Sequence, residues 1–412
     1  MKAVERRHLI PFILVTSLFA LWGLANNMSD TLLAAFKRIM QMSDTQTSFI
    51  QLAFYGAYFC LALPAALFIR RFSYKSGLIL GLCLYAGGAL LFWPAAHVES
   101  YAFYLIAIYI LASGCSVLET AANPFIMSMG SAETATRRLN IAQSFNPIGS
   151  IMGILVSKYF ILQDISLYSI SGTYAAVGLV LLGIMVISAF AIKSDPVKLM
   201  DESQLHVEHD KSLNPEPSTG SVIRRLLRNR VYTWGVVAQF FYVGAQICIW
   251  SFTIRLVMKE LDCVEAQAAT VYLVSIIGFC ISRFVYTWLM RFIQPVRLLF
   301  AGSLLCTFCT LTVMLTDGRT AVTALVFISV FMSLMFPTIY GIALGSLNDN
   351  GIERGDVKIG ASGLIMSILG GALLPPLQGM ISDATGSINV SYLVPMCCFL
   401  VVLCFALFNY KR

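Results

Sequence analysis

Two acidic residues lie inside long apolar stretches of the chain, where acids are rare. Asp30 falls within an apolar run over 9–36, and Glu119 falls within another over 101–129. An ionised side chain near the centre of a bilayer costs roughly 2.5–3.5 kcal/mol on insertion scales, so such groups usually face a cavity or a partner. Polar contacts that merely join helices do not require a carboxylate. The pattern therefore predicts a functional role for Asp30 and Glu119.

Side-chain amides accompany these acids at helical spacing. Members of a pair three or four residues apart lie on one face of a helix, so each pair forms a polar stripe. The simplest packing turns the stripes toward a shared aqueous cavity. For a single amide, a hydrogen bond between neighbouring helices is the alternative. The pairs are Asn26 with Asp30, Glu119 with Asn123, and Gln143 with Asn146.

The second half of the chain has no comparable acid in its apolar stretches. It offers amides and aromatic rings instead, among them Gln246 and Trp250. A polar wall opposite an aromatic wall suits a sugar, because hydroxyls need hydrogen bonds and the C–H face of the ring stacks on aromatic surfaces. Ordinary packing is the alternative for any one ring. Arg255 and Arg283 are interpreted as side chains that snorkel from the ends of spans.

The elements that must position these residues are membrane-spanning helices. The 412 residues are 58% hydrophobic and 12% charged, with a mean hydropathy of +0.79, whereas soluble domains carry about 25% charged residues. Apolar runs of about 20 residues cross about 30 Å of hydrocarbon, and lipid forces their backbone into helices. We predict an all-α membrane protein with twelve spans, at 9–36, 47–69, 77–95, 101–129, 138–160, 172–192, 231–258, 265–290, 296–316, 320–346, 358–381 and 390–410.

A polar segment and the positive charges predict the organisation and topology. The segment 193–230 separates an N-terminal six-helix bundle over 1–192 from a C-terminal bundle over 231–412 and is interpreted as a linker. Ala25-Asn26 aligns with Ala245-Gln246, which favours a duplicated, pseudo-symmetric unit. Of the 28 Lys and Arg residues, 21 fall on the side of both termini and the linker, and five fall opposite. The positive-inside rule places both termini in the cytoplasm.

Other composition and motif signals exclude several classes of protein. The net charge of +7 reflects topology, so no nucleic-acid partner is expected. HExxH, GxSxG and Walker motifs are absent from the sequence. Cys306 and Cys309 form a CxxC without a second pair, which favours buried packing over a metal. His206 and His209 lie in the polar linker, where a solvated segment is expected. We therefore predict no enzyme activity, no cofactor and no metal, with a membrane-embedded enzyme as the alternative.

The chain resembles the fucose permease branch of the major facilitator superfamily over essentially its full length. The most specific match is 118–125, which reads LETAANPF and contains Glu119. Further matches are Trp22 with 25–27 and Asp30, Gln51 with 53–58, Gln143 with Asn146, and 238–246. The resemblance implies the major facilitator fold, with twelve transmembrane helices in two pseudo-symmetric six-helix bundles. It also implies alternating access around a site at the middle of the membrane.

The same resemblance implies a substrate, a coupling ion and roles for residues. It implies sugar:proton symport with Asp30 and Glu119 as the coupling acids, and L-fucose as the sugar. Ser29 stands where fucose permeases have Asn, so glucose, galactose and N-acetylglucosamine remain alternative substrates. Sodium is the alternative coupling ion, and a sugar sensor that does not transport is the alternative function. We expect a monomer in the lipid bilayer of the inner (plasma) membrane. The predicted sugar-binding residues are Asn26, Asn27, Gln143, Asn146, Gln246 and Trp250.

Overall fold

The structure is a computed structural model in which helices make up almost all of the described chain, and the described part contains no strand. Eleven helical stretches are long and apolar enough to cross a membrane, and the first helix adds a shorter apolar stretch, Leu9–Leu24. The predicted all-α membrane architecture is therefore confirmed. The described residues are 9–41, 44–161, 166–191, 218–347 and 354–410, without the side chains of 25–27, 29–38, 44–49, 51, 158, 191, 265–266 and 354–356.

The first half of the chain supplies six membrane crossings, two of which are interrupted. The third crossing bends between α3 and α4, and the fifth is divided between α6 and α7. The helices are α1 (Leu9–Ile39), α2 (Asp44–Arg71), α3 (Tyr74–Leu90), α4 (Phe92–Val98), α5 (Tyr101–Met127), α6 (Ala135–Gln143), α7 (Asn146–Val156) and α8 (Leu167–Ala191).

The second half repeats this plan, and its fifth crossing is again divided. Its fourth crossing is divided between α14 and α15, and its fifth is divided between α16 and α17 by a short 3₁₀ turn over Ser367–Leu369. The helices are α11 (Arg230–Leu261), α12 (Glu265–Leu289), α13 (Pro295–Leu315), α14 (Gly318–Met332), α15 (Met335–Gly345), α16 (Arg354–Met366), α17 (Gly370–Thr385), α18 (Ile388–Ser391) and α19 (Leu393–Tyr410).

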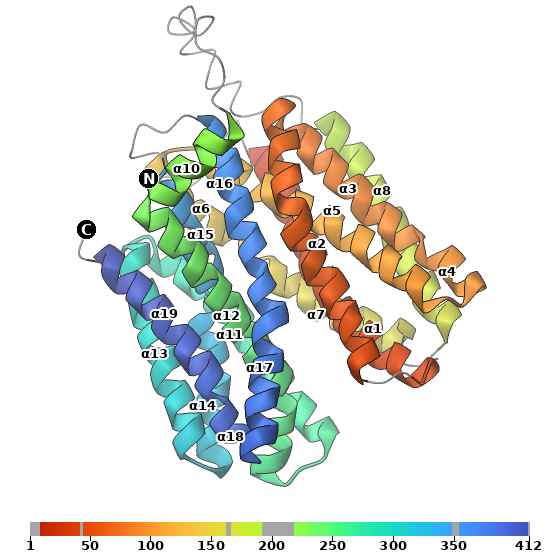
Figure 1. Cartoon of the computed structure of the whole chain (residues 1–412), viewed down its shortest axis with the longest axis vertical. Helices are drawn as coiled ribbons and strands as arrows, with labels where there is room; N and C mark the ends of the chain where they lie inside the picture. The colour runs from red at the N-terminus through yellow and green to blue at the C-terminus, as the bar shows by residue number, and fades with distance from the viewer. Residues whose placement is uncertain (1–8, 42–43, 162–165, 192–217, 348–353, 411–412) are drawn as a thin grey trace, which may run out of the picture.

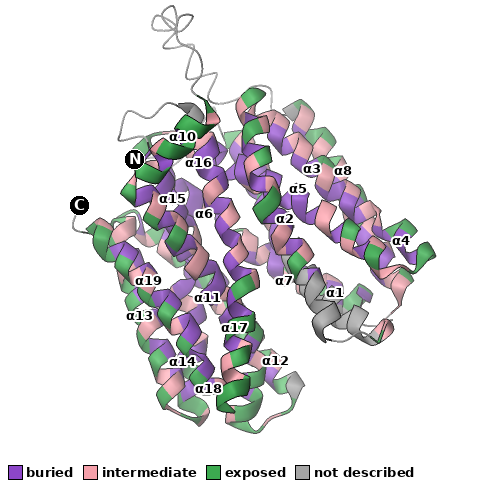
Figure 2. Ribbon diagram, viewed as in Figure 1, coloured by how far each residue is buried: buried purple, intermediate pink, exposed green. Residues whose placement is uncertain are grey.

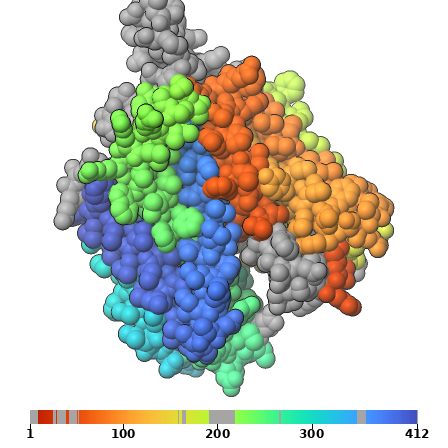
Figure 3. Space-filling view, in the orientation of Figure 1, coloured from red at the N-terminus to blue at the C-terminus, as the bar shows by residue number. Residues whose placement is uncertain are grey.

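The end of the predicted linker, 193–230, is a helix. α10 (Thr219–Arg228) begins at Ser218, whose hydroxyl accepts a hydrogen bond from the Ser221 backbone N–H. Val222 and Leu226 are four residues apart and are buried, because α10 packs against α11 and α16. The space-filling view shows α10 and the start of α11 in green on the outside of the second half (Figure 3). The end of the molecule at which α10 lies is called the linker end (Figure 1).

Large apolar side chains cover the outside of the helices. Phe190 is 79% exposed, Leu315 74% and Phe292 72%. Buried residues lie where helices face one another, and exposed residues lie on the outer faces (Figure 2). Exposure of so much apolar surface to water would be strongly unfavourable, so these faces are expected to contact lipid. The chain is therefore a multi-pass membrane protein.

The two halves stand side by side and touch mainly near the linker end. Lys358 of α16 donates from Nζ to the backbone carbonyl of Ile69 in α2 over 3.2 Å. Asn140 of α6 donates from Nδ2 to the hydroxyl of Thr338 in α15 over 3.4 Å. Toward the opposite end the halves diverge (Figure 1). The molecule is thus closed between the halves at the linker end.

Candidate functional site

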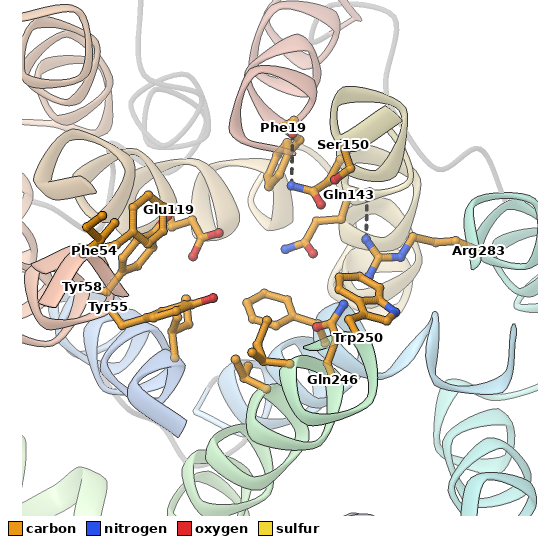
Figure 4. Close-up of a pocket in the computed structure, with 16 residues that line it drawn as sticks. Phe19, Phe54, Tyr55, Tyr58, Glu119, Gln143, Ser150, Gln246, Trp250 and Arg283 are labelled. Carbon is orange, nitrogen blue, oxygen red and sulfur yellow. Dashed lines mark hydrogen bonds between the residues drawn. The ribbon is translucent and has the colours of Figure 1, made fainter. Parts of the chain in front are cut away.

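A cavity of about 120 Å³ lies between the two halves, and both contribute to its wall. Five of the residues predicted from the sequence to bind sugar or a proton line it: Glu119, Gln143, Asn146, Gln246 and Trp250. Figure 4 labels four of them, Glu119, Gln143, Gln246 and Trp250, around the cavity. The remaining lining residues are Phe19, Ile50, Phe54, Tyr55, Tyr58, Ser150, Val243, Ile247, Arg283, Phe336 and Ile368.

Glu119 is the one acid among the described residues that line the cavity. It lies on α5, a helix that packs against α2 and α3 and is buried on nearly all sides. Its Oε2 atom is buried and has no hydrogen-bond partner. Tyr58 of α2 lines the cavity beside it, and the Tyr58 hydroxyl accepts a hydrogen bond from Trp22 Nε1 of α1 over 3.1 Å. Three helices therefore build the wall around this carboxyl group.

Arg138 fixes the linker-side end of the helix that carries Glu119. Its guanidinium is completely buried and donates from Nε to the carbonyl of Ile126 over 2.9 Å, with a further bond to the carbonyl of Met127. These carbonyls belong to the last turn of α5, where the helix has no internal donors left. The buried arginine thus donates hydrogen bonds to the terminal carbonyl groups of α5, and its positive charge stabilises the negative end of the helix dipole.

Gln143 and Asn146 reach the cavity from the break between α6 and α7. Gln143 ends α6, and Asn146 begins α7 directly before Pro147. A proline in the first turn of a helix loses no hydrogen bond, so the sequence places the break here. Gln143 Nε2 donates to Asn123 Oδ1 over 2.9 Å, and Asn146 Nδ2 donates to the Phe19 carbonyl over 3.2 Å. Both predicted residues are held in defined orientations.

Close contact between α1 and α7 supports this arrangement. A Cβ atom on Gly149 would lie 1.6 Å from the carbonyl oxygen of Ala20, and one on Gly23 would lie 2.0 Å from the carbonyl oxygen of Asn146. Only glycine allows the two backbones to approach so closely. These two glycines therefore set the distance of Asn146 from the first helix.

The second half contributes Gln246 and Trp250 from one face of α11. They are four residues apart and both line the cavity. The Trp250 ring meets Phe279 edge to face, with 5.1 Å between ring centroids, and its Nε1 atom is buried without a partner. The contact with Phe279 holds the aromatic ring of Trp250 at the wall of the cavity. The wall formed by α11 is therefore mixed, with an amide beside a ring.

Arg283 is part of the site, and the expectation that it snorkels from the end of a span is wrong. Its side chain is only 3% exposed and lies over the ring of Phe279, with 4.8 Å from Cζ to the ring centroid. Nε donates to the Ser333 carbonyl over 2.7 Å, and a terminal nitrogen donates to the Gln143 carbonyl over 2.9 Å. The guanidinium stays buried because these backbone carbonyls accept the hydrogen bonds that water would accept at the membrane surface.

Three predicted residues cannot be judged from side-chain geometry. Asn26, Asn27 and Asp30 lie within α1, but their side chains fall outside the described residues. Sequence reasoning also missed Tyr55 and Tyr58, which line the cavity from α2. The aromatic wall predicted for the second half alone is therefore shared by both halves.

The wall chemistry suits a ligand with many hydroxyl groups, and backbone carbonyls of Ser333 and Gln143 accept hydrogen bonds from the one lining arginine of the described residues, Arg283. Amides donate and accept hydrogen bonds, rings pack against C–H surfaces, and one carboxyl group can gain or lose a proton. Among the described residues, no group of three or more His, Cys, Asp or Glu side chains could hold a metal ion. The amides, the rings and the carboxyl group that line the cavity can together bind a ligand and exchange a proton.

Comparison with known proteins identifies the family. The chain matches the Major Facilitator Superfamily model over residues 12–355. It is 38% identical to the L-fucose-proton symporter of Haemophilus influenzae, over 97% of this chain and 96% of that protein. It is 35% identical to the L-fucose-proton symporter of Escherichia coli (98% and 94%) and 30% identical to a glucose/galactose transporter of Brucella abortus (96% and 93%).

A solved structure has the same architecture. The crystal structure of FucP, a major facilitator superfamily transporter in the outward conformation, matches with a TM-score of 0.77 at 34% identity. The match covers 98% of this chain and 99% of that one. Sequence and fold agree over nearly the whole length, and this chain belongs to the major facilitator superfamily.

Proposed function

We propose that this protein is a secondary active transporter that carries a monosaccharide together with a proton, and that its sugar is L-fucose. The proposal rests on one observation: Glu119, Gln143 and Trp250 surround a single cavity between the two halves. A protonatable acid, a fixed amide and an aromatic face are what coupled transport of a sugar needs. The two relatives named L-fucose-proton symporters support the choice of sugar and ion.

Transport proceeds by rocking of the bundles 1–192 and 231–412 about the cavity, with 193–230 as the linker between them. We assign the present state as outward-facing, because the halves touch at the linker end and diverge at the other. The change to an inward-facing state must break the bonds of Lys358 to Ile69 and of Asn140 to Thr338. The far ends of the bundles then close over the sugar.

The proton binds to Glu119, with Asp30 as the second coupling acid. Glu119 has a side-chain oxygen without a partner, so a proton can be accommodated there without breaking an existing bond. A protonated carboxyl is neutral, and a neutral site passes through a closed, dry state at lower cost than a charged one. The assignment of Asp30 depends on the resemblance to fucose permeases.

The sugar contacts amides on one side and rings on the other. Gln143 and Asn146 bind hydroxyl groups from the first half, Gln246 and Trp250 complete the site from the second half, and Asn26 and Asn27 are assigned from the resemblance. A 6-deoxy sugar offers a methyl group in place of a hydroxyl, and a ring or an aliphatic side chain accepts a methyl better. Glucose or galactose is the second candidate, because a glucose/galactose transporter is 30% identical to this chain.

The deciding experiment is a panel of labelled sugars in proteoliposomes with an imposed pH gradient. L-fucose should be accumulated and should be displaced better by unlabelled L-fucose than by glucose, galactose or N-acetylglucosamine. Better displacement by one of those sugars would reject L-fucose. A sodium gradient that drives uptake without a pH gradient would reject the proton. Binding without any flux would indicate a sensor.

The location of the protein follows from the proposed transport. We place it as a monomer in the inner (plasma) membrane with both termini in the cytoplasm. In spheroplasts, an impermeant thiol reagent should label Cys introduced at Arg319 and should label Cys at Arg224 only after permeabilisation. Both positions are exposed in the structure. Labelling of both positions from the outside would contradict this orientation.

A further inference from the structure

The Gln143 carboxamide is held by a neighbour that does not itself line the cavity. Gln143 Nε2 donates to Asn123 Oδ1 over 2.9 Å, and both residues are buried, with Asn123 0% and Gln143 4% exposed. The backbone carbonyl of Gln143 is fixed separately by Arg283. In Figure 4 the Gln143 side chain extends into the cavity, with its nitrogen toward the side that carries Glu119. Asn123 thus sets which way this amide faces.

A fixed amide binds a sugar more tightly than a free one. Ordering a side chain on binding costs roughly 0.5–1.5 kcal/mol, and prior fixing removes that cost. Fixing also decides which atom of the amide meets the ligand. With Nε2 bonded to Asn123, the Oε1 atom of Gln143 is left to accept a hydrogen bond from a sugar hydroxyl.

The surroundings of Asn123 favour this role over ordinary packing. Its Nδ2 group makes no well-formed hydrogen bond, and its polar neighbour is the hydroxyl of Tyr340, which is likewise buried without a well-formed bond. Its Oδ1 atom, in contrast, accepts a hydrogen bond of 2.9 Å from Gln143, which lines the site. An apolar residue of similar size would avoid the cost of burying the carboxamide, so the bond to Gln143 is the contact that distinguishes Asn123 from ordinary packing.

Asn123 also connects the sugar site to the proton site. It follows Glu119 by one turn on α5 and directly precedes Pro124. A movement of this part of α5 therefore reaches both the carboxyl group and the amide. We propose that Asn123 is a positioning residue that orients Gln143 for the sugar and ties it to the helix that carries Glu119. This inference rests on the proposed function, since it requires that Gln143 binds sugar.

A double-mutant cycle in sugar affinity tests the proposal. The Kd for L-fucose is measured by calorimetry on purified protein for the unchanged chain, Asn123→Ala, Gln143→Ala and the double variant. Asn123→Ala should raise Kd by about 2- to 10-fold, the range that corresponds to the ordering cost. In the double variant, the Asn123 change should add nothing to the effect of Gln143→Ala, because it acts through that residue.

Two further variants separate positioning from a loss of structure. Asn123→Asp keeps an acceptor oxygen at the same place, so it should restore affinity at acidic pH to within about threefold of the unchanged chain. Asn140→Ala removes another fully buried amide that bonds to Thr338 rather than to Gln143. Its effect should multiply with that of Gln143→Ala. If Asn123→Ala does not fold, Asn123→Ser supplies the same comparison.

The outcomes distinguish this proposal from the function on which it rests. If the unchanged chain binds L-fucose but the effects of Asn123→Ala and Gln143→Ala multiply, the positioning role is rejected and the function stands. An unchanged Kd in a folded Asn123→Ala variant has the same meaning. If the unchanged chain prefers another sugar of the panel, the cycle is measured with that sugar. If it binds none, the proposed function is rejected and the positioning role with it.

Discussion

Replacement of Glu119 by glutamine should separate sugar movement from proton coupling. Glutamine has the shape of a protonated glutamate but cannot release a proton. Glu119 is the one acid among the described residues that line the cavity, and its Oε2 atom has no partner whose bond the change would break. The variant should therefore bind sugar and cycle while loaded, yet be unable to use a proton gradient.

The size of the effect follows from the number of protons. The proposed transport assigns one proton for each sugar, carried on Glu119, the acid that lines the described wall of the cavity. A charge that crosses 100 mV of membrane potential releases about 2.3 kcal/mol. At about 1.4 kcal/mol for each factor of ten, this energy supports an accumulation of about 50-fold. The Glu119→Gln variant should reach equal concentrations inside and outside, a ratio of about one.

Two measurements in proteoliposomes check this prediction. Uptake under an imposed potential reports accumulation, and exchange of labelled for unlabelled sugar reports cycling without a gradient. Glu99→Gln is the matched control, because Glu99 is an exposed acid at the end of α4, away from the cavity. It should keep both activities. Accumulation well above a ratio of one by Glu119→Gln would contradict the role of Glu119 as the proton carrier, and so would loss of exchange in a folded variant.

Two predictions concern stability. Glu260 accepts hydrogen bonds from the Gly318 backbone N–H over 2.5 Å and from Asn389 Nδ2 over 3.0 Å. Glu260→Gln can leave one of these donors unpaired and should lower Tm by a few degrees, for a loss of roughly 1–3 kcal/mol. The control is Asp262→Asn, because Asp262 is exposed and its backbone φ of 46° is one that asparagine also adopts. The control should leave Tm unchanged. Equal decreases of Tm in the two variants would contradict the role of Glu260. Gly149→Ala should force α1 from α7 and reduce folded yield, because its Cβ would overlap a backbone carbonyl. Gly183→Ala should leave the folded yield unchanged, because a Cβ atom added there has no other atom within 4 Å. A normal folded yield for both variants would show that α1 and α7 can separate freely.

Most of the fold could be predicted because lipid leaves few choices. Apolar runs must be helices, and their lengths follow the thickness of the bilayer. The predicted span 101–129 corresponds to α5, Tyr101–Met127, and 296–316 corresponds to α13, Pro295–Leu315. The breaks inside spans were harder to locate. Pro337, in the first turn of α15, indicates a kink in this span, but it does not fix the exact place of the interruption, which lies at Ser333 and Leu334 between α14 and α15.

The site could be predicted in part, because some residue types are costly in a membrane. Glu119 and Gln143 were recognisable as polar groups within apolar helices, and both line the cavity. Tyr55 and Tyr58 were not recognisable, since an aromatic residue on an apolar helix suits lipid, core or cavity equally well. The helical spacing of Asn123 and Glu119 predicted a shared face, but it could not show that Asn123 bonds to Gln143 on another helix.

The many membrane crossings, the positions of the spans and the helices that carry rare polar groups all follow from the amino-acid sequence. These are local properties, because the cost of placing a residue in lipid depends mainly on that residue and its neighbours along the helix. Which polar groups meet depends instead on how the helices pack in three dimensions. Arg283 could have reached for water from the end of its helix, but the carbonyls of Ser333 and Gln143 hold it at the cavity. Contacts between distant segments depend on how helices rotate and pack, and hydrophobic periodicity alone does not fix that rotation when every face of a helix is apolar.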